Sequence, residues 1–161
     1  SLTLSPLTPA DMPAIEKLDE RAFGPGRFAL SAYRLREGVS PDPDLSFVAH
    51  VGTLLVGANR MTAIACGGKP ALLLGPLTVD PAFRSRGIGE ALMGKSMEAA
   101  RNAGHKLVIL VGDEPYYRRV GFKRAPQGRL TMPGPVDPAR LLYCELTEGA
   151  FEGVAGAITR A

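Results

Sequence analysis

The feature that most constrains this chain is a strand, a turn and a helix that follow one another between residues 71 and 103. Residues 71–79 are mostly apolar, which is typical of a buried strand, and Asp80 stands before a proline that favours extended conformation and so ends the pattern. After the segment RSRGIG at residues 84–89, apolar side chains recur at helical spacing until Gly104, which supplies a stop. The order predicts one strand–turn–helix unit of an α/β protein.

The turn has the properties of an anion-binding site. The first N–H groups of a helix have no intrahelical partners, and the helix dipole adds partial positive charge at that end. Gly87 and Gly89 carry no Cβ, so a phosphate can approach the backbone closely, and Arg84 and Arg86 add formal charge. We therefore expect this turn to bind a pyrophosphate.

A second motif overlaps the first. The sequence GEALMGKS, from Gly89 to Ser96, fits the P-loop pattern GxxxxGK[ST] of nucleoside triphosphatases. An apolar strand that ends at Asp113 also resembles the segment with which these enzymes bind magnesium. A P-loop must directly follow a strand, however, and the residues between its two glycines here are strong helix formers. We therefore expect Lys95 and Ser96 to lie on a helix, and keep a P-loop NTPase only as an alternative.

The hexad at residues 84–89 also fits the pattern RxxGxG, and here the chain resembles the GNAT superfamily of N-acetyltransferases, in particular its YhbS-type bacterial branch. The resemblance covers nearly the whole chain, and its most specific parts are LTVDPAFRSRGIGEALM and LVGDEPYYRRVGF. It implies one acetyltransferase domain over residues 1–161. The implied α/β fold is a mixed, mostly antiparallel sheet with a central parallel strand pair that is splayed at the cofactor site, and helices on both faces.

The resemblance also implies roles for individual residues. The RxxGxG turn would hold the pyrophosphate of acetyl-coenzyme A, and the preceding strand would offer its backbone to the pantetheine arm. The cofactor-binding residues implied in this way are Leu77, Thr78, Val79, Arg84, Ser85, Arg86, Gly87, Ile88 and Gly89. A tyrosine four residues before a Gly-Phe pair would approach the thioester sulfur, and Gly121-Phe122 makes Tyr117 that residue.

Acetyl transfer from a thioester needs a neutral amine and help for the departing thiolate. Because a phenol is a weaker acid than a thiol, we expect Tyr117 to donate a hydrogen bond to the sulfur rather than to transfer its proton fully. Simple aromatic packing is the competing role for Tyr117 and the expected one for Tyr116.

A dedicated general base is not evident in the sequence. Some relatives carry a glutamate in the strand before the turn, whereas residues 71–79 contain no carboxylate. Asp113 and Glu114 are candidates, although both could instead cap the next helix. His50 and His105 are expected at the surface or in turns. Deprotonation of the acceptor through water is therefore our expectation.

Composition narrows the remaining classes. A net charge of +3 gives no reason to expect a nucleic-acid partner, and no apolar run approaches the about 20 residues that cross a membrane. Acidic residues near the N-terminus argue against a secretory signal, so a cytoplasmic location is expected. Cys66 and Cys144 are expected to be reduced core thiols, with a disulfide or a reactive thiol as alternatives, and no metal site is predicted.

Periodicity and turn residues predict the other elements. A helix capped by Thr8 should bury Ile15, Leu18, Ala22 and Phe23 and end at Gly24-Pro25-Gly26. A helix over Phe28–Glu37 should turn Leu30 and Tyr33 inward and Arg34 and Arg36 outward. The expected strands span residues 2–4, 45–51, 53–66, 71–79, 106–111, 122–125 and 141–146, with a short helix from Pro115 to Arg118. Residues 126–140 should form a loop beside the ligand site, and residues 148–161 are not placed.

The strands before residue 79 should form an antiparallel meander, and residues 106–111 should pair in parallel with residues 71–79. The change of pairing makes a ligand crevice. The predicted function is N-acetyltransfer from acetyl-coenzyme A to a primary amine of a small molecule or peptide, by direct attack in a ternary complex. A non-catalytic acyl-coenzyme A binding or sensing module is the alternative. Tyr33, Arg34 and Arg36 could contact an acidic acceptor or form a solvated helix face, and a homodimer is possible.

Overall fold

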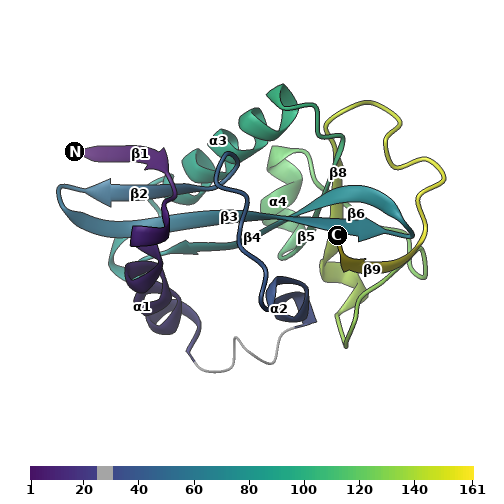
Figure 1. Ribbon diagram of the computed structural model, residues 1–161, viewed down its shortest axis with the longest axis horizontal. Helices are drawn as coiled ribbons and strands as arrows, with labels where there is room; N and C mark the ends of the chain where they lie inside the picture. The colour runs from purple at the N-terminus through teal and green to yellow at the C-terminus, as the bar shows by residue number, and fades with distance from the viewer. Residues whose placement is uncertain (25–30) are drawn as a thin grey trace.

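A computed structural model describes residues 1–24 and 31–161 of the chain, and most of its strands form one mixed sheet (Figure 1). The strands lie in the order β1, β2, β3, β4, β5, β8 and β6, while β9 pairs with both β3 and β7. Their bounds are Leu2–Pro6 for β1, Phe47–Val51 for β2, Leu54–Cys66 for β3, Lys69–Val79 for β4, Leu107–Val111 for β5, Lys123–Arg124 for β6, Leu130–Thr131 for β7, Leu141–Glu145 for β8 and Gly156–Arg160 for β9. Within the main sheet, β4 and β5 are parallel and the other neighbours are antiparallel.

The helices cover both faces of this sheet (Figure 1). The α-helices are Met12–Phe23 (α1), Ser31–Arg36 (α2), Ile88–Asn102 (α3) and Glu114–Tyr117 (α4), and short 3₁₀ helices span Pro9–Asp11, Pro81–Phe83, Arg118–Val120 and Pro138–Arg140. Val48 of β2 packs in one cluster with Leu18 of α1, whereas the next residue, Ala49, packs in another with Leu92 of α3. Successive side chains of a strand point to opposite faces, so α1 and α3 lie on opposite sides of the sheet.

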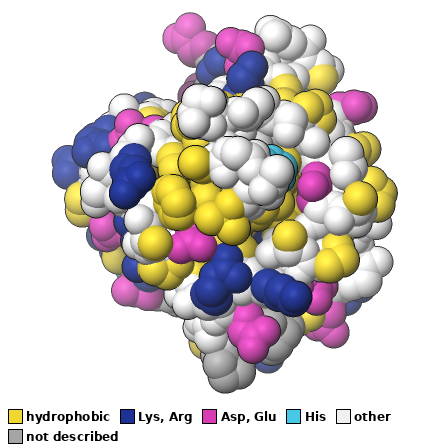
Figure 2. Space-filling model, turned by 90° about the vertical axis from the view of Figure 1, so that its left-hand side faces the viewer, with side chains coloured by type: hydrophobic (Ala, Val, Ile, Leu, Met, Phe, Trp, Pro, Cys, Tyr) yellow, Lys and Arg dark blue, Asp and Glu magenta, His cyan; other side chains and the backbone are white. Residues whose placement is uncertain are grey.

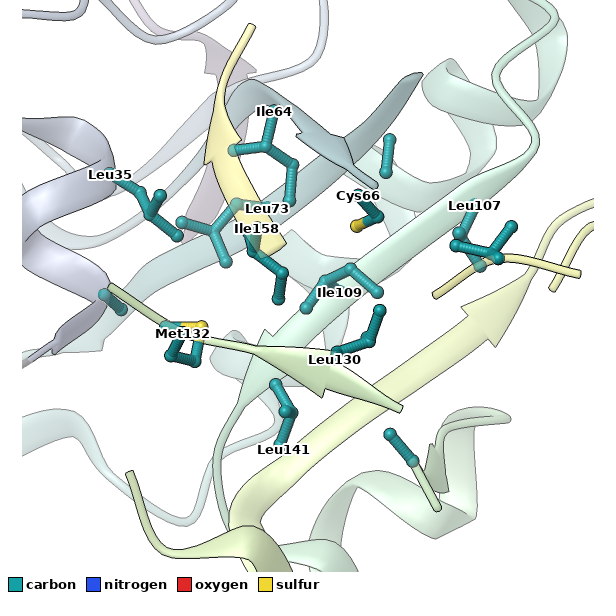
Figure 3. Close-up of a cluster of buried hydrophobic side chains, with 14 of the residues drawn as sticks. Leu35, Ile64, Cys66, Leu73, Leu107, Ile109, Leu130, Met132, Leu141 and Ile158 are labelled. Atoms are coloured by element: carbon teal, nitrogen blue, oxygen red, sulfur yellow. The ribbon is translucent and has the colours of Figure 1, made fainter. Parts of the chain in front are cut away.

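The part of the core beside β9 joins segments that are far apart in the sequence (Figure 3). Leu35 of α2, Ile109 of β5 and Ile158 of β9 belong to one cluster of buried side chains, together with Leu130 and Met132. Residues 148–161, which sequence patterns did not place, are therefore anchored in the core through β9.

The parallel contact between β4 and β5 is short. It consists of the pairs Leu72↔Val108 and Leu73↔Ile109. Beyond them β4 continues along β3 to the pair Gly57↔Val79, and β5 continues along β8 to the pair Val111↔Leu141. Both strands remain paired on their outer edges while they separate from each other, so the sheet is splayed from Leu74 onward.

The pairing of β3 with β4 is irregular where β4 begins to separate from β5. The register passes from Asn59↔Leu77 to Met61↔Leu74, which leaves Arg60 on one strand and Gly75-Pro76 on the other outside the ladder. Next to this irregularity, the backbone N–H of Met61 donates a hydrogen bond to the side chain of Ser46, at 3.0 Å from Oγ. A bulge of this kind re-aims a side chain, and Arg60 forms an ion pair with Asp19 of α1.

Most predicted elements are confirmed within a few residues, and three predictions are wrong. The strand at residues 141–146 is not the last one, because β9 follows it. Phe23 is 48% exposed instead of buried. The helix predicted over Phe28–Glu37 is α2, at Ser31–Arg36, and Arg36 lines a cavity instead of facing outward. The cap at Thr8 is confirmed, with Asp11 as its partner, although the first turn is a 3₁₀ helix and α1 itself begins at Met12. Pro25, Gly26, Phe28 and Leu30 lie outside the described residues.

The surface at one end of the sheet is partly apolar. Leu2 and Leu54 are 44% and 51% exposed, and both pair with Val51 across neighbouring strands. That end faces the viewer in Figure 2, where hydrophobic side chains are bordered by both basic and acidic ones. Among the described helices, none combines the length and apolar character that crossing a membrane requires. Cys66 and Cys144 are both buried and unpaired.

Candidate functional site

Two cavities adjoin the splayed strands. The larger, of about 560 Å³, lies between β4 and β5, and its lining includes Gly75 and Pro76 of β4 and Val111 of β5. The smaller, of about 200 Å³, lies beside the end of β4 and the start of α3. Phe23, Leu77 and Tyr117 line both cavities. A ligand in one cavity would therefore meet a ligand in the other at these three residues.

The smaller cavity gathers much of the predicted site. Five of the predicted cofactor residues and the predicted catalytic tyrosine line it, namely Leu77, Thr78, Val79, Arg84, Gly89 and Tyr117. Ser85, Arg86 and Gly87 lie on the exposed turn, where the Arg86 guanidinium stands 5.0 Å from the Phe83 ring centroid. Ile88 is buried instead, and packs with Leu92 against the sheet. The side chain of Ile88 thus serves the core, and only its backbone is free for a ligand.

The backbone of the turn is shaped for an anion. Ser85 and Gly87 have φ values of 64° and 78°, so two of its residues are in the left-handed region, which a serine seldom adopts. The first hydrogen bond of α3 runs from Ala91 N–H to Gly87 O at 3.0 Å, and the N–H groups of residues 84–90 donate to no described residue. Unpaired amides at a helix start are a suitable site for phosphate.

Two residues near this turn were not predicted as part of the site. Arg119 forms an ion pair with Glu90 of α3, and its guanidinium lies 5.1 Å from the Tyr116 ring centroid. Tyr116 lines the smaller cavity, and a Cβ added at Gly89 would be 3.5 Å from its hydroxyl. Burial and the charge of Glu90 raise the pKa of Tyr116, and Arg119 partly offsets this effect. The sequence carries no signal for the Glu90–Arg119 pair, since its members are far apart along the chain.

Tyr117 is held by its neighbours. Its ring lies 4.9 Å from that of Tyr116 and 6.1 Å from that of Phe122, in edge-to-face arrangements. Burial raises the pKa of Tyr117 to about 12, with smaller contributions from Tyr116 and Asp113 in the same direction and from Arg140 in the opposite one. The phenol is therefore protonated at neutral pH and can donate a hydrogen bond.

Helix α1 is tied to the splayed part of β4 by polar contacts. Asp19 Oδ1 accepts a hydrogen bond from Thr78 Oγ1 at 2.7 Å, while Asp19 Oδ2 contacts Arg60. Arg21 and Asp80 form an ion pair at 3.0 Å, with the arginine side chain 48% exposed. These contacts place Phe23, at the end of α1, where the two cavities meet.

The predicted candidates for a general base lie away from both cavities. Neither Asp113 nor Glu114 lines them, and the same holds for His50 and His105. Asp113 stands before α4 but does not cap it with its side chain, and Glu114 pairs with Arg118 at 3.4 Å. The carboxylates that line the larger cavity are those of Glu16, Asp19 and Asp137.

The alternative P-loop lies inside a helix. Residues 89–96 belong to α3 from its second residue onward, with Lys95 exposed. Ser96 is buried and accepts a hydrogen bond from Asn59 Nδ2 at 2.9 Å. A continuous helix cannot wrap a phosphate with its backbone amides, so the prediction that Lys95 and Ser96 are ordinary helix residues is confirmed.

Comparison with known proteins gives consistent results. Residues 42–124 match the family model described as an acetyltransferase (GNAT) domain. The chain is 31% identical over 118 residues to the uncharacterized N-acetyltransferase YjhQ of Escherichia coli K12, an alignment that covers 71% of this chain and 65% of YjhQ. It covers less than two thirds of the length of each of the curated relatives that it matches.

Solved structures show the same fold. The GNAT family N-acetyltransferase YhbS of Escherichia coli, solved in complex with CoA, has a TM-score of 0.84 at 24% identity, covering 99% of this chain and 89% of that one. A GNAT family acetyltransferase from Brucella melitensis, solved in complex with acetyl-CoA, has a TM-score of 0.66 at 27% identity and covers 94% of this chain and 99% of its own.

Proposed function

Because the chain belongs to the GNAT acetyltransferase family, we propose that it is an N-acetyltransferase that transfers the acetyl group of acetyl-CoA to a primary amine by direct attack in a ternary complex. The observation that carries this proposal is the meeting of two cavities at Phe23, Leu77 and Tyr117. Direct transfer needs both reactants bound side by side, since holding two reactants in contact and in the right orientation supplies much of the rate acceleration. The Brucella melitensis relative in complex with acetyl-CoA supports the choice of donor.

The residues beside the smaller cavity fit acetyl-CoA. The free N–H groups of residues 84–90 would bind its pyrophosphate, with Arg84 and Arg86 as counter-charges. The edge of β4 that faces β5 has no strand partner among the described residues beyond Leu73. Residues 77–79 therefore have backbone groups available for the pantetheine arm. When bound, the cofactor supplies an acetyl thioester.

Tyr117 has the position and protonation state for one role in this reaction. It lines both cavities, and its raised pKa keeps the phenol protonated. We assign to it a hydrogen bond to the thioester sulfur, which strengthens as negative charge develops there. Proton transfer from so weak an acid to a thiolate is uphill, so the hydrogen bond alone is its contribution.

Loss of the ammonium proton is assigned to water. Both oxygens of Asp19 are already engaged, by Thr78 and Arg60, and Glu16 and Asp137 are exposed. Bulk water at the mouth of the larger cavity can take the proton before the amine attacks. The alternative is a protein that binds acyl-CoA without turnover, and an activity assay distinguishes the two.

Binding of the donor is tested by calorimetry with acetyl-CoA. We expect micromolar binding by the wild type and an about 10-fold weaker complex for Arg84→Ala, because one charge-assisted contact to phosphate is lost. Lys95→Ala is the matched control: it removes an exposed cation from α3, outside the turn that carries Arg84, and should leave the affinity unchanged. Equal affinity of the Arg84 variant and the wild type would remove this turn from the site, and magnesium–ATP binding lost in Lys95→Ala would favour the P-loop.

Turnover is tested by release of free thiol from acetyl-CoA over a panel of amines. We expect acetylation of at least one amine, and an about 10- to 100-fold lower kcat for Tyr117→Phe with little change in acetyl-CoA affinity. If acetyl-CoA binds normally while wild type and variant are inactive towards every amine, the protein is a binding module and the catalytic proposal is wrong.

A further inference from the structure

The larger cavity is lined by an arginine that forms no ion pair with any described residue. Arg36, at the end of α2, lines this cavity, and a Cβ added at Gly75 would stand 3.4 Å from its Nη2. Gly75 is the second residue of β4 beyond the last β4–β5 pair. The guanidinium of Arg36 therefore lies at the base of the splay, two residues from Leu77, where the two cavities meet.

The two charged groups that act on Arg36 are paired with each other. Asp19, the buried carboxylate of the cavity, is engaged by Arg60 and Thr78. Within the described residues Arg36 takes part in no ion pair, and its enclosed Nε has no hydrogen-bond partner, as is also true of the Nε of Arg60. The buried group of Asp19, Arg36 and Arg60 thus carries one excess positive charge.

The remaining charges of the lining lie at its solvent side. Glu16, Asp137 and Arg140 are all exposed, and the Asp137 side chain accepts a hydrogen bond from Ala139 N–H at 2.9 Å. Over the whole lining, acidic and basic side chains are equal in number, so the location of the charges decides which ligand fits. Burial, and then the charge of Arg60, lower the pKa of Arg36 to about 10, while Asp19 acts in the opposite direction. Arg36 is thus still charged at neutral pH.

We infer that the acceptor is an amine that also carries a carboxylate, and that Arg36 binds this carboxylate while the amine faces the point where the cavities meet. The inference rests on the proposed acetyltransferase function. An arginine fork matches a carboxylate with two parallel hydrogen bonds, and a buried cation gains most from such a partner. A phosphate offers the same chemistry, and the test below distinguishes the two.

Distance and lining narrow the acceptor further. Strand residues rise about 3.3 Å each, so Gly75 and Leu77 are within about 7 Å, which suits an amine and a carboxylate separated by a few bonds. Much of the lining is apolar, including Phe23, Leu74 and Val136. An α-amino acid with an apolar side chain satisfies both conditions. Its neutral nitrogen would form the C–N bond, the C–S bond would break with its electron pair going to sulfur, and a second amine proton would leave to solvent. The thiolate would take up a proton from water, giving an N-acetylamino acid and a free thiol.

The experiment compares acceptors that differ only in the anionic group. Acetylation rates are measured for L-phenylalanine against phenethylamine, and for O-phosphoethanolamine against ethanolamine. We expect kcat/KM to be about 10- to 100-fold higher for L-phenylalanine than for phenethylamine. Arg36→Met should abolish this preference, mainly by raising KM for L-phenylalanine, with phenethylamine unaffected. Arg36→Lys should restore part of it. Arg124→Met, which removes an exposed cation on β6 that lines neither cavity, should behave as the wild type.

A binding measurement keeps the inference testable without turnover. Calorimetry in the presence of CoA compares N-acetyl-L-phenylalanine with N-phenethylacetamide, on wild type and on Arg36→Met. Tighter binding of the carboxylate that is lost in the variant supports the inference even if no amine is acetylated, in which case only the catalytic proposal is wrong. Preference for the uncharged ligand of each pair overturns it. Equal loss of both ligands in a variant that still binds CoA also overturns it. If, in the rate comparison, only O-phosphoethanolamine is preferred over its uncharged counterpart, the anionic group of the acceptor is a phosphate and not a carboxylate.

Discussion

At the scale of single residues, the position of Tyr117 depends on an absent side chain. A Cβ added at Gly112 would lie 2.5 Å from Cε2 and 3.0 Å from Cδ2 of the Tyr117 ring. Gly112 directly follows β5, so only a glycine lets the ring of α4 pack against the end of that strand. The motif YxxxGF identified the tyrosine in the sequence, but no local pattern marks a glycine five residues earlier as its support.

Gly112→Ala should therefore displace the Tyr117 ring. We expect a loss of about 1–3 kcal/mol in the free energy of unfolding, because the new methyl group overpacks the site, and a lower kcat with nearly unchanged acetyl-CoA affinity. Urea denaturation and steady-state kinetics measure the two effects. Gly94→Ala is the matched control: nothing lies within 4 Å of its added Cβ, so a gain of about 1 kcal/mol and wild-type activity are expected. A fully active Gly112 variant would contradict this account of Tyr117.

The raised pKa of Tyr117 predicts the shape of the pH profile. The phenol is neutral below its pKa, so an increase from 10 to about 12 extends the range in which it can donate a hydrogen bond. We expect kcat/KM to rise with pH as the acceptor amine loses its proton, and to show no fall due to tyrosine ionisation up to about pH 10.5. A falling limb near pH 9–10 that is absent in Tyr117→Phe would show that the phenol ionises normally.

At the scale of elements, α1 is the helix whose attachment most affects the site. Sequence periodicity correctly predicted that Ile15 and Leu18 are buried in the core, but it also predicted that Phe23 is buried there. Phe23 ends the helix beside the cavities, and an apolar pattern does not distinguish a side chain that meets the core from one that lines a cavity. The polar contacts of Asp19 and Arg21 join segments more than 40 residues apart, so no local spacing reveals them.

The two attachments of α1 should differ in strength. Asp19→Ala leaves Arg60 mostly buried without a counter-charge, since the two side chains are only 8% and 13% exposed, and should cost about 3 kcal/mol of unfolding free energy. Arg21→Ala breaks a more exposed pair and should cost less than about 1 kcal/mol. Urea denaturation of both variants measures the difference, and equal costs would mean that burial does not set the strength of these pairs.

At the scale of the whole molecule, the predicted order of strands and helices is largely confirmed, because each element has a strong local pattern. The mixed sheet with its parallel pair followed from one apolar strand on either side of α3. Two features were missed for physical reasons. In β9 only Ile158 is buried, so its sequence does not alternate clearly, and its pairing with β3 depends on distant residues. Arg36 was assigned to solvent because helical spacing reports distance from the core and cannot reveal a polar cavity beside it.

The candidate site was predictable from the sequence only in part. Residues 84–89 and Tyr117 belong to short motifs, so the sequence indicated them directly. Arg60 and Tyr116 line the cavities because a bulge and a ring contact bring them there, and Arg119 lies beside Tyr116 through its ion pair with Glu90. The cavities themselves are a property of the strand pairing, which no single segment encodes.

The sheet consists of two parts, β1 to β4 and β5, β8 and β6, which are joined only by the short pairing of β4 with β5 in the order of the described strands. The ladders that join β1 to β4 and β5 to β8 are longer, so the two parts are connected to each other by fewer pairs than their main strands are within each part. We expect ligands to enter and leave as the two parts of the sheet flex about this short contact, since local opening is easiest where few backbone pairs must separate.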